Sequence, residues 1–111
     1  HFGRIINIGS ISAQTPRMDS AAYTTSKHGI VGLTKSTALE GRSFGVIASC
    51  LHAGNVDTQI RSGEDSFDDE EPMMAPVDVA EAALTMATLP DNVNMLEAIV
   101  LPVTQLYIGR G

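Results

Sequence analysis

Three short apolar runs, at residues 4–9, 46–52 and 98–101, stand out along the chain. Each is too short for a buried helix, so each is predicted to be a strand. Residues 21–40 and 77–89 lie between the runs and are predicted to be helices, with Pro76 in the first turn of the second. Residues 11–17 are predicted to be a loop. The order strand-helix-strand-helix-strand predicts an α/β fold with parallel pairing through right-handed crossovers.

The longer predicted helix has two distinct sides. Asp19 or Ser20 can cap its start and Gly41 ends it. The side expected to face the core consists of Ile30, Leu33, Thr37 and Ala38. Another side carries the small residues Ala22, Ser26 and Gly29. Because Gly29 and Gly32 each weaken a helix by about 1 kcal/mol relative to alanine, close packing is expected there, either on the sheet or on the same helix of a second subunit. In the second helix, the residues expected to face inward are Val79, Ala83 and Ala87.

Ser10, Tyr23 and Lys27 form the chemically most informative group. Tyr23 and Lys27 are four residues apart and share one face of a helix. A free phenol has a pKa near ~10, and a cation within a few ångström stabilises the phenolate and lowers that pKa. Such a phenol can give a proton to a carbonyl oxygen or take one from an alcohol. Ser10 follows the first predicted strand, and its hydroxyl could hydrogen-bond the same substrate oxygen.

The position of these residues supports a single crevice. Ligands of parallel α/β sheets bind beyond the carboxyl ends of the strands. Ser10 follows the end of the first predicted strand, and residues 54–58 follow the end of the second. Both groups are therefore expected to face the same crevice.

Several spaced segments together resemble the catalytic segment of the short-chain dehydrogenase/reductase family. They are Gly3-Arg4-Ile5-Ile6-Asn7-Ile8-Gly9-Ser10, Tyr23-Thr24-Thr25-Ser26-Lys27, His28-Gly29-Ile30-Val31-Gly32-Leu33-Thr34 and Ala53-Gly54-Asn55-Val56-Asp57-Thr58. The resemblance implies that Ser10 orients the substrate oxygen and Tyr23 is the general acid/base. It also implies that Lys27 favours the deprotonated phenol and holds the nicotinamide ribose.

Further site residues are expected on the cofactor side and the substrate side of the crevice. Tyr23, Lys27, Gly54, Val56 and Thr58 are expected to bind the cofactor, NAD or NADP. The residues expected to contact the substrate are Ser10, Gln14 and Met18. Gln14 and Met18 lie between the serine and the tyrosine, and their alternative role is to pack this loop. The family has Pro-Gly at the turn after the second strand, whereas this chain has Ala53-Gly54. Ala53 lacks the fixed φ of proline, which puts the rigidity of this turn in doubt.

The resemblance also implies a glycine-rich phosphate-binding turn and four more strands before residue 1. No Gly-x-x-x-Gly-x-Gly occurs in the sequence. We therefore expect residues 1–111 to be the C-terminal catalytic half of one Rossmann-like domain, a doubly wound parallel sheet, without its N-terminal dinucleotide-binding half.

Composition adds mainly exclusions. The chain is 43% apolar and 18% charged, with no basic patch for nucleic acid and no run of membrane-spanning length. Its one cysteine, Cys50, lies in a predicted strand and is expected to be buried. His1, His28 and His52 lack metal-ligand spacing, so no metal site is expected. A cytoplasmic location is expected by default.

The net charge of −6 comes from one segment. Six acids, Glu64, Asp65, Asp68, Asp69, Glu70 and Glu71, fall within eight positions. Such a run is usually a solvated loop because like charges repel. The family resemblance offers a second interpretation, a substrate-covering loop over residues 59–75 whose apolar contacts are Phe67, Met73 and Met74.

The sequence therefore predicts an NAD(P)-dependent oxidoreductase that interconverts a small-molecule alcohol and a carbonyl compound. The chain alone is expected to be inactive, and its parent is expected to be a homodimer or homotetramer assembled through the 21–40 helix. Two alternatives stay open. One is a sugar-nucleotide epimerase or dehydratase of the extended branch of the family. Against this alternative, the 53 residues after Thr58 (111 − 58) are too few for the substrate domain of that branch. The other is a non-catalytic half-domain that acts only in assembly.

Overall fold

The computed structural model describes residues 2–57 and 72–108. Its elements, in chain order, are β1 (Gly3–Ile8), the 3₁₀ helix η1 (Ile11–Ala13), α1 (Ala21–Gly41), the 3₁₀ helix η2 (Arg42–Phe44), β2 (Val46–Ala53), α2 (Pro76–Ala87) and β3 (Glu97–Val100). Every predicted strand and helix is found, with bounds shifted by no more than two residues. One turn of 3₁₀ helix occupies part of the predicted 11–17 loop. Among the described residues, no helix is long and apolar enough to cross a membrane.

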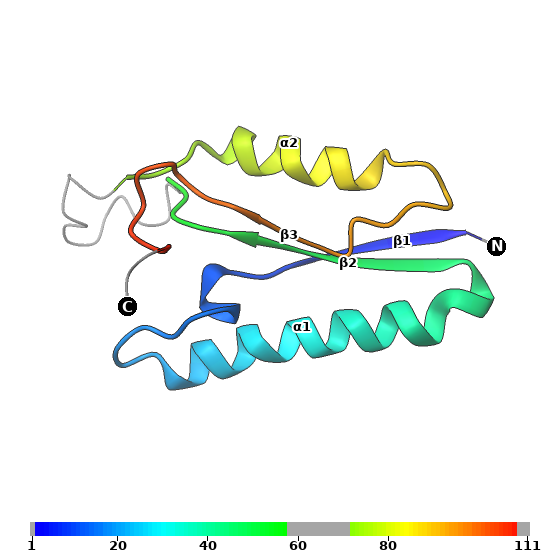
Figure 1. Ribbon diagram of the computed structural model, residues 1–111, viewed down its shortest axis with the longest axis horizontal. Coiled ribbons are helices and arrows are strands. Elements are labelled where there is room, and N and C mark those ends of the chain that lie inside the picture. The colour runs from blue at the N-terminus through cyan, green and yellow to red at the C-terminus, as the bar shows by residue number, and fades with distance from the viewer. Residues whose placement is uncertain (1, 58–71, 109–111) are drawn as a thin grey trace.

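The three strands form one parallel sheet in the order β1-β2-β3, so the fold is Rossmann-like as predicted. Helices α1 and α2 cover opposite faces of this sheet (Figure 1). The hydrogen bonds of β1 agree with this arrangement. The Asn7 side chain donates to Thr34 of α1, whereas Arg4 donates to the backbone oxygen of Leu89 just beyond α2. Arg4 and Asn7 are three residues apart, so their side chains point to opposite faces.

This arrangement corrects the expected handedness. The chain crosses the sheet in one direction, from β1 to β2 to β3. Helices on opposite faces then give the two crossovers opposite hands, so the prediction that both are right-handed is wrong for one of them.

The core is centred on β2, which is covered on both faces. Its fully buried residues are Ala48, Ser49, Cys50, Leu51 and His52, and the predicted burial of Cys50 is confirmed. Helix α1 contributes Thr34, which is 1% exposed. Leu33 is 58% exposed, so its predicted place in the core is wrong. The reason is the polar Asn7 beneath the helix, whose amide donates to the Thr34 hydroxyl at 2.9 Å.

A similar correction applies to α2. Val79 and Ala83 are half-buried as predicted, but Ala87 is exposed. Met86, one residue earlier, is 1% exposed and fills the position in the core. Helical spacing alone could not distinguish neighbouring positions at the end of this helix.

The small residues of α1 do not pack on the sheet. Ala22, Ser26 and Gly29 are exposed, and a Cβ atom added at Gly29 or Gly32 would meet nothing within 4 Å. Of the two expected packing partners, the sheet is therefore ruled out for this side of the helix. The alternative, a second subunit, stays a prediction.

Candidate active site

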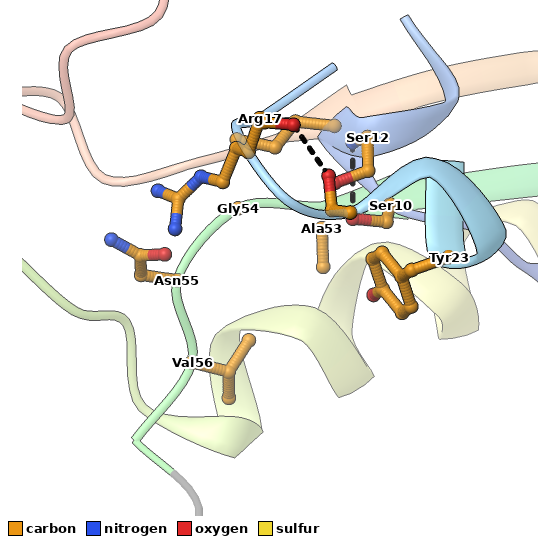
Figure 2. A pocket seen from close by; sticks show the side chains of 10 residues that line it. Ser10, Ser12, Arg17, Tyr23, Ala53, Gly54, Asn55 and Val56 are labelled. Atoms are coloured by element: carbon orange, nitrogen blue, oxygen red, sulfur yellow. Dashed lines mark hydrogen bonds between the residues drawn. The ribbon is translucent and has the colours of Figure 1, made fainter. Parts of the chain in front are cut away.

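A pocket of about 450 Å³ opens beyond the carboxyl ends of β1 and β2. Its walls come from two parts of the chain that are far apart in sequence. The lining residues are Ser10, Ile11, Ser12, Arg17, Ser20, Tyr23, Ala53, Gly54, Asn55 and Val56. Figure 2 shows Ser10 and Tyr23 side by side in the pocket, with the 53–56 segment across from them. The predicted crevice at the strand ends is thus present.

Ser10 is held in a defined place by the short helix that follows it. It is the N-cap of η1, and its Oγ accepts a hydrogen bond from the Ser12 amide at 3.1 Å. The Ser10 carbonyl accepts another from the Ala13 amide at 2.9 Å. A serine hydroxyl has one hydrogen and two lone pairs. The Ser10 Oγ therefore keeps its own hydrogen for a bond to an oxygen in the pocket.

Tyr23 lies in the first turn of α1 and is 51% exposed. Lys27 follows one turn later, with its Nζ 5.6 Å from the centroid of the Tyr23 ring. The same ammonium donates a long hydrogen bond of 3.4 Å to the Ile8 carbonyl. The structure therefore brings Ser10 and Tyr23 into one pocket, while Lys27 stands beside Tyr23 at the end of β1 and does not line the pocket.

The position of Ser10 also depends on a close contact one residue earlier. A Cβ atom added at Gly9 would lie 2.3 Å from Nδ1 of His52. Any larger residue would have to displace this imidazole, which is fully buried. Gly9 therefore lets the backbone before Ser10 lie directly against the His52 ring.

His52 belongs to a hydrogen-bonded group that sequence reasoning missed. Its Nε2 lies 2.6 Å from Oε2 of Glu97 in β3. The same oxygen accepts a hydrogen bond from Nε2 of Gln14 at 2.9 Å. Glu97 thus links the loop after Ser10 to the ring that supports Gly9. The apolar run that predicted β3 began at residue 98, so the hydrophobic pattern gave no reason to include Glu97.

The opposite wall is the segment from Ala53 to Val56, and the backbone of this segment and of Asp57 is extensively hydrogen-bonded. The Gly54 amide donates to the Val100 carbonyl at 2.8 Å. Met74 pairs with both sides of Val56, since its amide donates to Asn55 and its carbonyl accepts from Asp57. Met74 is itself buried. These bonds hold the turn in place although it lacks proline, and its rigidity stays a prediction.

The remaining predicted site residues are placed as follows. Gly54 and Val56 line the pocket, whereas Gln14 points to Glu97 and Met18 is 89% exposed. The alternative in which Met18 packs the loop is not supported by this exposure. Thr58 and most of the expected covering loop, residues 59–71, lie outside the described residues.

Ser12, Arg17 and Ser20 also line the pocket, although none of them was predicted as a site residue and Ser20 was predicted only as a candidate helix cap. Figure 2 shows the Arg17 guanidinium directed toward Asn55 across the pocket. Only their position between the serine and the tyrosine could have indicated them.

Metal chemistry finds no support in the described part of the chain. Residues 2–57 and 72–108 contain no group of three or more His, Cys, Asp and Glu side chains that could hold an ion. Cys50 is a free, buried thiol, and desolvation raises its pKa. Cys50 is 1% exposed and packs in the core of the sheet.

Comparison with known proteins identifies the family to which the chain belongs. The short chain dehydrogenase family model matches residues 1–69, more than half of the chain. The chain therefore belongs to the short-chain dehydrogenase family.

Individual relatives point the same way. The chain is 48% identical over 59 residues to the uncharacterized oxidoreductase YxjF of Bacillus subtilis, covering 53% of this chain and 23% of that protein. It is 33% identical over 101 residues to an uncharacterized oxidoreductase of Staphylococcus epidermidis, covering 91% of this chain and 43% of that protein. The closed form of a serine dehydrogenase complexed with NADP⁺ has the same fold, with a TM-score of 0.82, 24% identity and coverage of 97% and 47%. The chain thus spans less than half the length of each.

Proposed function

We propose that this chain carries the proton-transfer site of an NAD(P)-dependent oxidoreductase that interconverts an alcohol and a carbonyl compound. The observation that carries the proposal is the meeting of Ser10 and Tyr23 in one pocket, with Lys27 one helical turn from Tyr23. Membership of the short-chain dehydrogenase family supports the reaction class.

Each of the three side chains has a proposed role that its contacts support. Ser10 Oγ already accepts the Ser12 amide, so it donates its hydrogen to the substrate oxygen. Tyr23 is half-exposed at the pocket and exchanges the proton with the same oxygen. Lys27 makes one long bond to Ile8, which leaves donors for other acceptors.

The residues present fit a nicotinamide cofactor. The lining of the pocket combines Ala53 and Val56 with the hydroxyls of Ser10 and Tyr23, an arrangement suited to a flat ring beside a reacting alcohol. The remaining donors of Lys27 suit the hydroxyls of a ribose. When bound, the cofactor supplies or accepts the hydride. The NADP⁺ complex of the serine dehydrogenase with the same fold supports this choice of cofactor class.

The proposal is tested with the purified protein in which this segment occurs. Purified enzyme is mixed with NAD⁺ or NADP⁺ and a panel of primary and secondary alcohols, and reduced nicotinamide is followed by absorbance. We expect reduction of one cofactor with at least one alcohol. Absence of turnover with both cofactors, together with absence of cofactor binding, would favour the non-catalytic assembly role.

We further propose that the chain is the C-terminal half of one Rossmann-like domain. Within the described residues β1 pairs only with β2, and its Ile5 and Ile8 are 43% and 54% exposed. An apolar strand with an open edge recruits another chain unless a neighbouring strand covers it.

The half-domain proposal predicts the behaviour of the 111-residue polypeptide alone. We expect it to associate or be poorly soluble and to show no measurable binding of NAD⁺ or NADP⁺, since the helix N-terminus that binds phosphates would be absent. Sedimentation and calorimetric titration measure both properties. A stable monomer that binds either cofactor at micromolar concentration would refute the proposal. A cytoplasmic location and assembly through α1 stay predictions.

A further inference from the structure

The wall of the pocket formed by residues 53–56 is supported by a side chain from the other end of the chain. Gln105 lies beyond β3 and is only 8% exposed. Its Oε1 accepts a hydrogen bond from the Asn55 amide at 2.8 Å, across 50 positions of sequence. The backbone N–H of Gln105 donates to the Pro102 carbonyl at 3.0 Å, so a local turn fixes the position of the Gln105 backbone.

Gly54 and Gln105 fit each other closely. A Cβ atom added at Gly54 would lie 2.4 Å from Oε1 of Gln105 and 2.8 Å from Cβ of Leu101. The space that Gly54 leaves open is therefore the space that the Gln105 carbonyl group needs to reach the next amide. Any side chain at position 54 would displace the acceptor.

A glutamine at position 105 is energetically unfavourable if its only role is to fill space in the core. Its Nε2 is buried and has no hydrogen-bond partner among the described residues. An unpaired buried amide nitrogen is unfavourable, and an apolar side chain of similar volume would avoid that cost. The part of the side chain that is satisfied is Oε1, on the Asn55 amide.

We propose that Gln105 is a positioning residue that fixes the Gly54–Asn55 backbone and thereby shapes the cofactor-binding wall of the pocket. Gly54, Asn55 and Val56 line the pocket, while Gln105 does not, so it acts through the turn and not on a ligand. The kinetic part of this inference rests on the proposed function, whereas the structural part does not.

The test uses three variants of the longer protein that contains this segment. Gln105→Met keeps the volume and removes the acceptor, Gln105→Glu keeps an oxygen acceptor, and Gly54→Ala pushes the acceptor away. Met86→Ala is the matched control, because Met86 is 1% exposed but does not line the pocket. Each protein is assayed for cofactor KM, kcat, thermal midpoint and hydrogen exchange of the Asn55 amide.

We expect Gln105→Met and Gly54→Ala to raise the KM for the cofactor about five- to tenfold, as the loss of one hydrogen bond implies, with a smaller change in kcat. Both should speed exchange at Asn55. Gln105→Glu should keep exchange at Asn55 and the cofactor KM close to wild type. Met86→Ala should lower the thermal midpoint without changing the cofactor KM.

Two results would overturn the inference. Unchanged exchange at Asn55 in Gln105→Met would remove the structural link, and faster exchange with an unchanged cofactor KM would make Gln105 a purely structural residue. If Gln105→Met does not fold, Gly54→Ala and Gln105→Glu decide by the same readouts. If the enzyme has no cofactor-dependent activity, the proposed function fails, and exchange at Asn55 still decides whether Gln105 holds the turn.

Discussion

The two walls of the pocket differ in where their support comes from. The wall with Ser10 and Tyr23 is formed by residues 9–27, in η1 and the first turn of α1, and its one distant support described above is the His52–Glu97 pair behind Gly9 and Gln14. The wall with Gly54 and Asn55 is held by Val100 and Gln105, which lie about 50 residues further along the chain. The reacting groups are thus close together in sequence, while the groups that hold them in place are spread over the whole chain. Substitutions at the first wall should impair proton transfer, and those at the second should weaken cofactor binding.

The largest effect is expected for Tyr23→Phe in the longer enzyme. The variant keeps the ring but loses the hydroxyl, so carbonyl reduction should fall about 10²–10⁴-fold, the usual contribution of a positioned acid or base. Cofactor affinity, measured by fluorescence titration, should change little. Retention of most activity would remove Tyr23 from the mechanism and end the distinction between the walls.

Lys27→Met should have the next largest effect, because the ammonium beside Tyr23 is lost. We expect about a 10- to 100-fold loss of kcat/KM, the range of one charge-assisted hydrogen bond, with weaker cofactor binding. Lys35→Met, on the same helix and exposed, is the matched control. If both variants behave like wild type in steady-state assays, Lys27 is a bystander.

Glu97→Ala tests whether the first wall also depends on distant residues. The buried His52 would lose its partner and Gln14 its acceptor, so the free energy of unfolding should fall by about 1–3 kcal/mol. Activity should fall as well, because Gly9 rests on the His52 ring. Glu97→Gln keeps a hydrogen-bonding side chain and should lose less. Denaturant unfolding of both variants, with exposed Glu81→Ala as control, measures the difference, and equal stability of all three would contradict the linkage.

The smallest effect is expected for Ala53→Pro. Proline would add rigidity to a turn that Val100, Met74 and Gln105 already hold. The cofactor KM should therefore change by less than about twofold, compared with the five- to tenfold increase expected for Gln105→Met. A large decrease in this KM on adding proline would show that the turn is loose in the wild type.

The same division explains how much could be predicted from the sequence. Strands, helices and the Ser10–Tyr23–Lys27 group follow from local patterns and spacing, and the structure has each element. The placement of Leu33 was wrong because a single polar residue in β1, Asn7, selects Thr34 as its neighbour. Glu97 and Gln105 were missed because their partners are separated from them by 45 and 50 residues. The hand of one crossover was predicted wrongly because α1 and α2 lie on opposite faces of the sheet (Figure 1), which the order of elements along the chain does not reveal.

The most direct test of the account is to follow the hydride. The longer enzyme is given a carbonyl substrate, established from the alcohol panel, and a reduced cofactor deuterated at the hydride-donating carbon of nicotinamide. The product is then examined by mass spectrometry and NMR. We expect one deuterium on the former carbonyl carbon in the wild type and a greatly slowed transfer in Tyr23→Phe. Product without deuterium, or transfer at equal rates in both proteins, would contradict it.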